Sequence, residues 1–95
     1  MTEQEFSQLV HEHKSSIYTV CYMFSKDEDE VNDLFQEILI NLWRGIDSFK
    51  GEAKLSSWIY RISLNTCISA DRKKKRALTE RLDMNINLYE DNDAD

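Results

Sequence analysis

Arginine and asparagine side chains recur at helical spacing in the second half of this 95-residue chain. Arg61, Asn65 and Arg72 fall on one stripe of a predicted helix, because residues three, four or seven apart share a helix face. Arginine binds phosphates and stacks on bases, and an asparagine amide offers a donor and an acceptor to a base edge. This pattern favours nucleic-acid binding, although any solvated helix could carry it. The whole stripe is Ser57, Arg61, Asn65, Ile68 and Arg72.

A polar segment before that helix adds an aromatic ring. Phe49 lies between Ser48 and Lys50 and is followed by Gly51. A base stacked on an aromatic side chain is worth roughly 1–3 kcal/mol, which helps to hold one nucleotide out of a duplex. An equally good interpretation is that Phe49 is a hydrophobic plug that closes the loop. Both hold if the ring forms the wall of a pocket.

The helix before this loop has a second unusual face. Its core side is predicted to be Val31, Leu34, Phe35, Ile38 and Leu42. The opposite side is polar and acidic, yet it contains Ile40 and is flanked by Trp43, and folding does not explain an exposed isoleucine. Apolar anchors ringed by polar groups are typical of a helix that binds a protein partner. The alternative is that Trp43 packs into the local core and the acids are merely solvated. The polar side comprises Asp33, Gln36, Glu37, Ile40, Asn41 and Arg44.

The charge of the chain is distributed unevenly. The net charge of -6 argues against a nucleic-acid partner when it is taken alone. Residues 1–40 carry nine acids and two bases, residues 41–81 carry ten bases and four acids, and residues 82–95 carry five acids and no base. A basic middle between acidic ends indicates one surface that faces a polyanion. The run Arg72 to Arg76 would extend it as a track for a phosphate backbone, although such a run is usually a solvated helix end.

The elements that must position these residues are helices. Two glycines and no proline disfavour β architectures built on tight turns, and the apolar spacing predicts an all-α, small three- to four-helix bundle. We expect one helix, or two nearly in line, to end near Ser25. The next helix begins at an Asp27 cap, with Glu30 three residues later, and ends at about Arg44. A third starts near Ser56 and ends within the basic run. Residues 1–81 form the domain, and the acidic residues 82–95 are expected to be a disordered linker or tail.

No enzyme chemistry is indicated. The sequence has no glycine-rich phosphate loop, no metal-ligand spacing and no convincing nucleophile and base pair, so we expect no catalytic residue, metal or cofactor. His11 and His13 are two residues apart and point to different faces. Cys21 and Cys67 lie in apolar stretches and are predicted to be buried, reduced thiols. The longest apolar run covers eight residues, so we expect a cytoplasmic protein without membrane insertion.

Four blocks in a fixed order then carry a family resemblance. They are Asp33-Leu34-Phe35-Gln36-Glu37, Leu42-Trp43-Arg44, Asp47-Ser48-Phe49-Lys50-Gly51-Glu52, and Ser57-Trp58-Ile59-Tyr60-Arg61-Ile62 with Asn65. Together they resemble the region 2 domain of bacterial sigma factors, in the extracytoplasmic-function group, over about residues 5–76. The resemblance implies a transcription initiation factor that docks on the clamp helices of the RNA polymerase beta-prime subunit. It also implies that the domain opens promoter DNA at the minus-ten element by capturing a flipped non-template base.

The resemblance assigns roles to the two faces. The polymerase-binding residues would be Asp33, Gln36, Glu37 and Trp43. Ile40, whose exposure folding does not explain, lies on the same face and joins the predicted polymerase-binding residues. The residues that bind promoter DNA would be Ser48, Phe49, Lys50, Arg61 and Asn65. The basic run adds Arg72, Lys73 and Arg76 to the predicted DNA-binding residues. An anti-sigma factor is a further partner that the family implies. The second DNA-binding domain of the family, which reads the minus-thirty-five element, is absent from these residues, so we expect a domain of a longer protein.

The sequence departs from the family pattern at two positions. Leu55 stands where many relatives have an aromatic residue, and the paired tryptophans that housekeeping sigma factors use for melting are represented by Trp58 alone, which is itself predicted to be core. Two other functions are weaker alternatives. The first is a helical protein-interaction module, a regulator or adaptor without specific DNA recognition. A helix-turn-helix repressor is disfavoured, because Phe49 in a loop suits a single strand better than a duplex groove.

Overall fold

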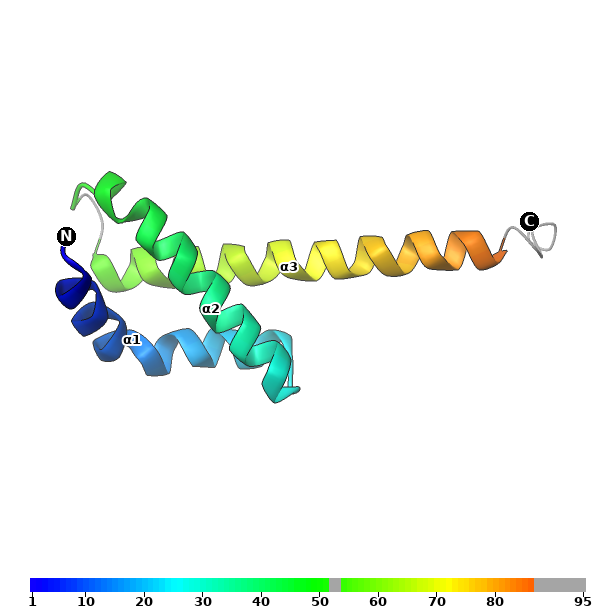
Figure 1. The fold of residues 1–95 in the computed structure, drawn as a ribbon, viewed down its shortest axis with the longest axis horizontal. Coiled ribbons are helices and arrows are strands. Elements are labelled where there is room, and N and C mark those ends of the chain that lie inside the picture. Colours follow the sequence, from blue (N-terminus) through cyan, green and yellow to red (C-terminus); the bar gives the residue numbers. More distant parts are fainter. Residues whose placement is uncertain (52–53, 87–95) are drawn as a thin grey trace.

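The computed structural model describes residues 1–51 and 54–86 of the chain. Its elements are α1 (Glu3–Phe24), α2 (Glu28–Gly45), a short 3-10 helix η1 (Ile46–Ser48) and α3 (Leu55–Ile86). Within these described residues there is no strand, which confirms the predicted all-α class. The first predicted helical stretch is one continuous helix, whose first turns tilt away from the rest (Figure 1).

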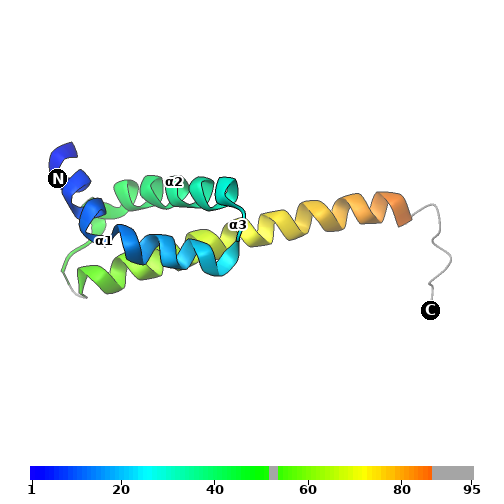
Figure 2. The ribbon, with the colours of Figure 1, turned by 90° about the horizontal axis from the view of Figure 1, so that it is seen from below.

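The three long helices form a bundle from which α3 projects. Each of them packs against both of the others. In two perpendicular views α1 and α3 run side by side in the same direction, and α2 returns across them (Figures 1 and 2). The C-terminal part of α3 extends past the bundle, which gives the molecule dimensions of 57 × 27 × 19 Å. The basic run of the sequence therefore begins where α3 leaves the bundle.

The core is made of the residues that the 3.6-residue periodicity selects. α1 contributes Leu9, Ile17, Val20 and Cys21, α2 contributes Val31, Ile38 and Leu42, and α3 contributes Trp58, Ile59 and Cys67. The remaining predicted core positions, such as Phe35 and Ile62, are half-buried around this centre. Two buried polar side chains on α3 satisfy themselves within the helix, since the hydroxyls of Ser63 and Thr66 donate to the carbonyl oxygens of Ile59 and Ile62.

Side-chain caps fix the starts of α1 and α2. Thr2 and Glu5 form a reciprocal capping box at the start of α1, with distances of 2.9 and 3.1 Å. At the start of α2 the predicted Asp27 cap is confirmed, because its carboxylate accepts from the amide of Asp29 at 3.1 Å. The predicted role of Glu30 in that cap is wrong, since its carboxylate binds Ser25 and Lys74 instead.

The predicted bounds of α3 were too narrow. The helix starts at Leu55, one residue before the proposed Ser56 cap, and continues to Ile86. Residues 82–86, which the sequence predicts to be part of the tail, are therefore helical. Residues 77–82 contain no glycine or proline and are rich in good helix formers, so nothing local ends the helix after the basic run. The rest of the proposed tail, residues 87–95, lies outside the described residues.

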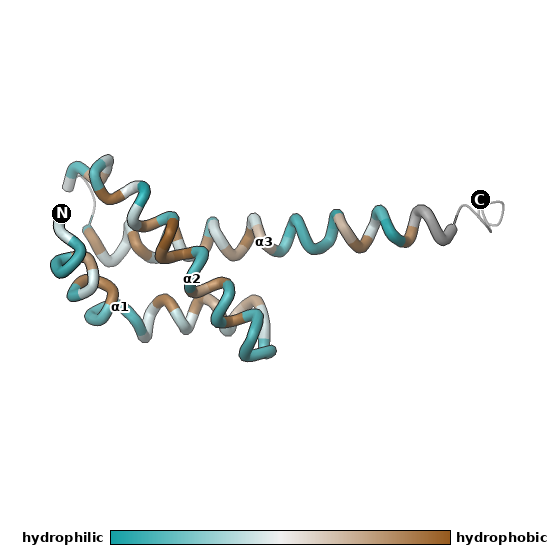
Figure 3. The backbone as a smooth tube through the Cα atoms, in the orientation of Figure 1, coloured by the Kyte–Doolittle hydropathy of each residue, from teal (hydrophilic) through white to brown (hydrophobic). Residues whose placement is uncertain are grey.

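The projecting part of α3 is mostly hydrophilic, with isolated apolar residues (Figure 3). Among the side chains that the structure describes there, Leu78 and Leu82 are large, apolar and exposed. No helix in the described part of the chain has the length and apolar character that crossing a membrane requires.

Candidate nucleic-acid interface and partner-binding face

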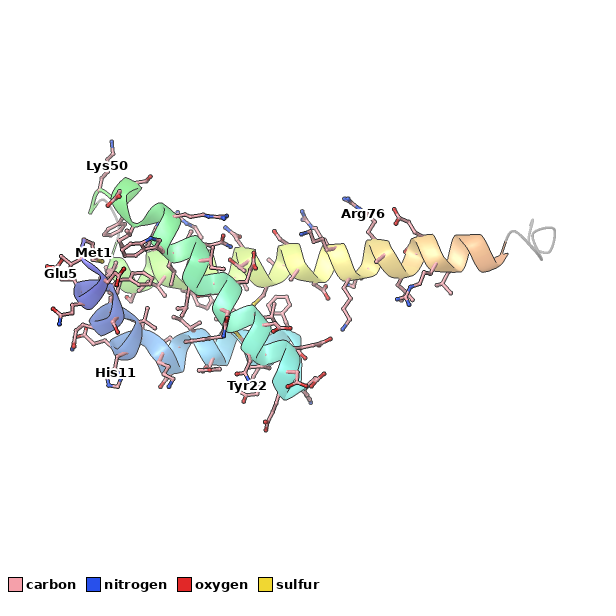
Figure 4. The ribbon with its side chains drawn as sticks, in the orientation of Figure 1. Met1, Glu5, His11, Tyr22, Lys50 and Arg76 are labelled. Atoms are coloured by element: carbon pink, nitrogen blue, oxygen red, sulfur yellow. The ribbon has the colours of Figure 1, made fainter. Side chains whose placement is uncertain are left out.

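Phe49 lies at the end of η1 with one side packed on the core. Its ring centroid is 5.2 Å from that of Trp58, with the planes inclined at 41°, and its backbone amide donates to the carbonyl oxygen of Ile46 at 3.2 Å. Phe49 is half-buried, whereas Ser48 and Lys50 beside it are exposed. The ring therefore closes the end of the core, as the plug interpretation requires, and still presents accessible surface. Figure 4 shows Lys50 projecting away from the bundle at this end.

The predicted α3 stripe is exposed except at Ile68. Arg61, Asn65, Arg72 and Arg76 are all exposed, and the intervening Ile68 is half-buried. At 3.6 residues per turn these four exposed side chains fall within about 60° of the helix circumference, and Arg61 and Arg76 are about 22 Å apart along the axis. Each strand of a B-form duplex has one phosphate per about 3.4 Å of axis, and an unpaired strand is more extended, so this face spans at most about six phosphates. The stripe starts at Arg61, about one helical turn beyond Trp58, the residue on which Phe49 packs.

Some cations of the basic run form salt bridges with acidic side chains of the protein, and others face solvent. Lys74 pairs with Glu30 of α2 at 2.7 Å, and Lys75 pairs with Asp71 at 3.2 Å. The hydrogen bond from Lys74, assisted by that from Ser25, lowers the pKa of Glu30, and Glu30 raises the pKa of Lys74. Within the described residues Arg72, Lys73 and Arg76 make no salt bridge. Figure 4 shows Arg76 projecting from the part of α3 beyond the bundle.

The exposed apolar residues of α2 lie where the sequence predicts them. Ile40 is 46% exposed and Trp43 is 43% exposed, and Asp33, Gln36 and Glu37 are also exposed. Trp43 meets the ring of Phe6 edge-on, with centroids 4.9 Å apart. Trp43 therefore packs against one neighbouring ring, as the alternative interpretation requires, but it stays exposed, which that interpretation does not predict. Phe6 belongs to this apolar patch, and its place there depends on how α1 crosses α2, which no local sequence signal reveals.

Asn41 does not belong to the exposed face to which we assigned it. It is half-buried, and its amide donates to the hydroxyl of Thr66 at 2.8 Å across the α2–α3 interface. That hydroxyl in turn donates to the carbonyl oxygen of Ile62 at 2.7 Å. The side chain faces α3 because α3 packs against the edge of the polar stripe and not only against its predicted core side.

A groove of about 490 Å³ separates the two candidate faces. Asp33 and Glu37 of α2 line one wall, Asn65 and Lys73 of α3 line the other, and apolar side chains such as Leu34 form part of the lining. Residues assigned to polymerase and residues assigned to DNA thus border the same groove. The structure brings Asn65 close to the acidic face, which the stripe of α3 alone does not indicate.

The other reactive side chains are engaged within the fold. Cys21 of α1 and Cys67 of α3 are free thiols and fully buried, as predicted. Burial, followed by the neighbouring Cys21, raises the pKa of Cys67 to about 12. The Nδ1 atom of His13 lies 3.0 Å from the carbonyl oxygen of Leu9 in its own helix. Among the described residues, no three His, Cys, Asp or Glu side chains are grouped so that they could hold a metal ion.

Comparison with known proteins assigns the family. The family model of sigma-70 region 2 matches residues 9–77. The chain is 38% identical to the ECF RNA polymerase sigma factor SigW of Bacillus subtilis over 77% of this chain and 39% of that relative. It is 36% identical to the ECF RNA polymerase sigma-E factor of Escherichia coli over 67% of this chain and 33% of that relative.

A third relative, the ECF RNA polymerase sigma factor SigM of Mycobacterium tuberculosis, is 30% identical over 74% of this chain and 36% of its own length. The chain thus spans less than two fifths of the length of these curated relatives. No solved structure gives a significant match to it. Three packed helices and the matched family model agree, and the chain belongs to the sigma-70 region 2 family, in the extracytoplasmic-function group.

Proposed function

We propose that this domain is the part of a sigma factor that binds RNA polymerase and recognises and opens the promoter minus-ten element. The observation that carries the proposal is that Phe49 is half-buried on Trp58, in the first turn of the helix whose exposed stripe contains Arg61, Asn65 and Arg72. A partly accessible ring beside a cationic helix face has the two components of a single-strand site, a stacking platform and phosphate contacts. The flipped non-template base would stack on Phe49, with Ser48 and Lys50 at the edge of its pocket.

The α2 face supplies the proposed polymerase contact. Ile40 and Trp43 would insert as apolar anchors between the beta-prime clamp helices, and Asp33, Gln36 and Glu37 would form the polar rim. An anti-sigma factor is a proposed competitor for these surfaces. The domain acts by binding alone, in the cytoplasm with polymerase, and has no catalytic role of its own.

Selection on a random single-strand library tests the DNA part without a known promoter. We expect the wild-type chain to enrich a short motif, and we expect Phe49→Ala and Asn65→Ala to abolish preference for that motif over its scrambled version. Tyr22→Ala is the matched control, since it removes an exposed aromatic of α1, away from α3 and the loop. Equal affinity of the wild type for the motif and its scrambled version would refute specific recognition and leave the protein-interaction module as the function.

A further inference from the structure

Trp58 lies directly beneath the ring of Phe49 and is almost inaccessible itself. It is 7% exposed, and its ring centroid is 5.2 Å from that of Phe49. A side chain so buried does not touch DNA directly. It is nevertheless the described aromatic neighbour of the ring to which we assign base stacking.

Gly45 approaches the six-membered ring of the same indole. A Cβ atom built on Gly45 would lie 3.3 Å from Cζ2 of Trp58 and 3.9 Å from its Cη2. The first distance is tighter than an ordinary contact, so a larger residue at position 45 would push the indole by a few tenths of an ångström. Gly45 thus sets how deeply Trp58 can lie against the end of α2.

The backbone at Gly45 gives no other reason for a glycine. Its φ of -98° and ψ of -5° lie in a region open to any L-amino acid. Glycine also disfavours a helix relative to alanine, and Gly45 is the last residue of α2. The position therefore accepts a less favourable helix former, and the proximity of the Trp58 ring is the contact that explains this.

Gly45 and Phe49 are linked by η1, which fixes the backbone but not the ring. The amide of Phe49 donates to the carbonyl oxygen of Ile46, so the turn holds the backbone of the loop against α2. The ring of Phe49 rotates about two side-chain torsions, and its packing on Trp58 decides its position. A binding site keeps its selectivity only if its groups are held to within about 0.5 Å, which is the scale of the displacement that a Cβ at Gly45 would cause.

We propose that Gly45 and Trp58 are positioning residues for base recognition, because the missing Cβ of Gly45 lets the Trp58 indole hold the Phe49 ring in its stacking position. The inference rests on the proposed function, since it assumes that Phe49 stacks on an unpaired base. It adds two residues that no exposed surface reveals. It also predicts that selectivity depends on a contact within the fold.

Gly45→Ala is the test variant, because its backbone already suits alanine and the helix favours it. We expect the variant to remain folded and to show a three- to tenfold lower affinity ratio between the selected single strand and its scrambled version. Affinity for the scrambled strand should stay the same, because phosphate contacts from α3 do not pass through Trp58. Ring-current shifts of the Phe49 protons, measured by NMR, should change together with the ratio.

A double-mutant cycle with Phe49→Ala separates the two claims. In the Phe49→Ala background, adding Gly45→Ala should have no further effect on the ratio. If Phe49→Ala alone leaves the ratio unchanged, Phe49 does not stack on a base, and the central claim of the proposed function is refuted. If Phe49→Ala abolishes selectivity while Gly45→Ala leaves the ratio at the wild-type value, the positioning role alone is refuted.

Trp58→Phe provides a second route should Gly45→Ala fold poorly. Phenylalanine lacks the Cζ2 atom that faces Gly45, so we expect this variant to lower selectivity by itself and to make the added Gly45→Ala neutral. Full selectivity in a folded Trp58→Phe variant would overturn the inference.

Discussion

Asn41 of α2 donates its side-chain amide to the hydroxyl of Thr66 of α3, with 2.8 Å between nitrogen and oxygen. The two residues are 25 positions apart in the chain and join the helix that carries the proposed polymerase contacts to the helix that carries the proposed DNA contacts. The hydroxyl also donates within α3, so this pair helps to fix the position of one helix relative to the other, and both residues line the shared groove.

Removing this hydrogen bond is expected to destabilise the domain measurably. Asn41→Ala should lower the free energy of unfolding by about 1 kcal/mol, the usual net value of one hydrogen bond. Thr66→Val should cost about 1–3 kcal/mol, because it leaves the half-buried amide of Asn41 without its partner. Urea denaturation measures both changes, and Gln36→Ala at an exposed position of α2 serves as the control. Strictly additive effects in the Asn41→Ala/Thr66→Val double variant would contradict a direct interaction.

Ile40→Ala is predicted to weaken polymerase binding without loss of stability. Ile40 is 46% exposed, so truncation removes little packing from the free domain. Binding to a beta-prime clamp-helix fragment, measured by calorimetry, should weaken about tenfold, as is usual for an anchor worth more than 1 kcal/mol. Glu37→Ala should weaken it as well. Glu28→Ala, an exposed acid in the first turn of the same helix, should not. Unchanged affinity in both Ile40→Ala and Glu37→Ala would refute the assigned face.

The salt dependence of single-strand binding should distinguish the free cations of α3 from the paired ones. The proposal has five phosphate-binding cations, so the logarithm of the binding constant should fall against the logarithm of the salt concentration with a slope of about -3.5. These cations are Lys50, Arg61, Arg72, Lys73 and Arg76. Arg72→Gln should reduce the magnitude of the slope by about 0.7 and weaken all sequences alike. Lys74→Gln should change neither slope nor affinity, because Lys74 points to Glu30. A similar loss in both variants would show that the ion pair does not withhold Lys74 from DNA.

The two buried cysteines are predicted to be inert in the folded protein. With a pKa of about 12, Cys67 is ionised at pH 8 in about one molecule in ten thousand, whereas an ordinary thiol is ionised in about a quarter. Alkylation of the native protein should therefore be at least a hundredfold slower than in denaturant, as followed by mass spectrometry. Because the folded pKa is raised, the thiol favours the folded state below the ordinary pKa and loses this contribution as the pH rises toward 12. Rapid labelling of the native protein would contradict this burial.

The sequence determined the faces of the helices. Helical periodicity alone was enough to select the core and to predict that Ile40 and the α3 stripe are exposed, because side chains three and four residues apart share a face whatever the helix packs against. The ordered motifs also indicated the family, which the family model confirmed. The end of α3 was predicted wrongly, since asparagines and acids after Arg81 suggested a tail while the good helix formers before it continued the helix.

Only the tertiary structure decided which of these faces meet. Asn41 lies in an interface and not in solvent, Glu30 pairs with Lys74 across 44 positions, and Gly45 lies against Trp58. Each of these contacts depends on the angle at which α2 crosses α3. Periodicity does not set that angle, because it emerges from the packing of many side chains at once. The sequence therefore revealed the candidate ring of Phe49 and the basic stripe, and only the packed fold revealed that Phe49, Trp58 and Gly45 lie together.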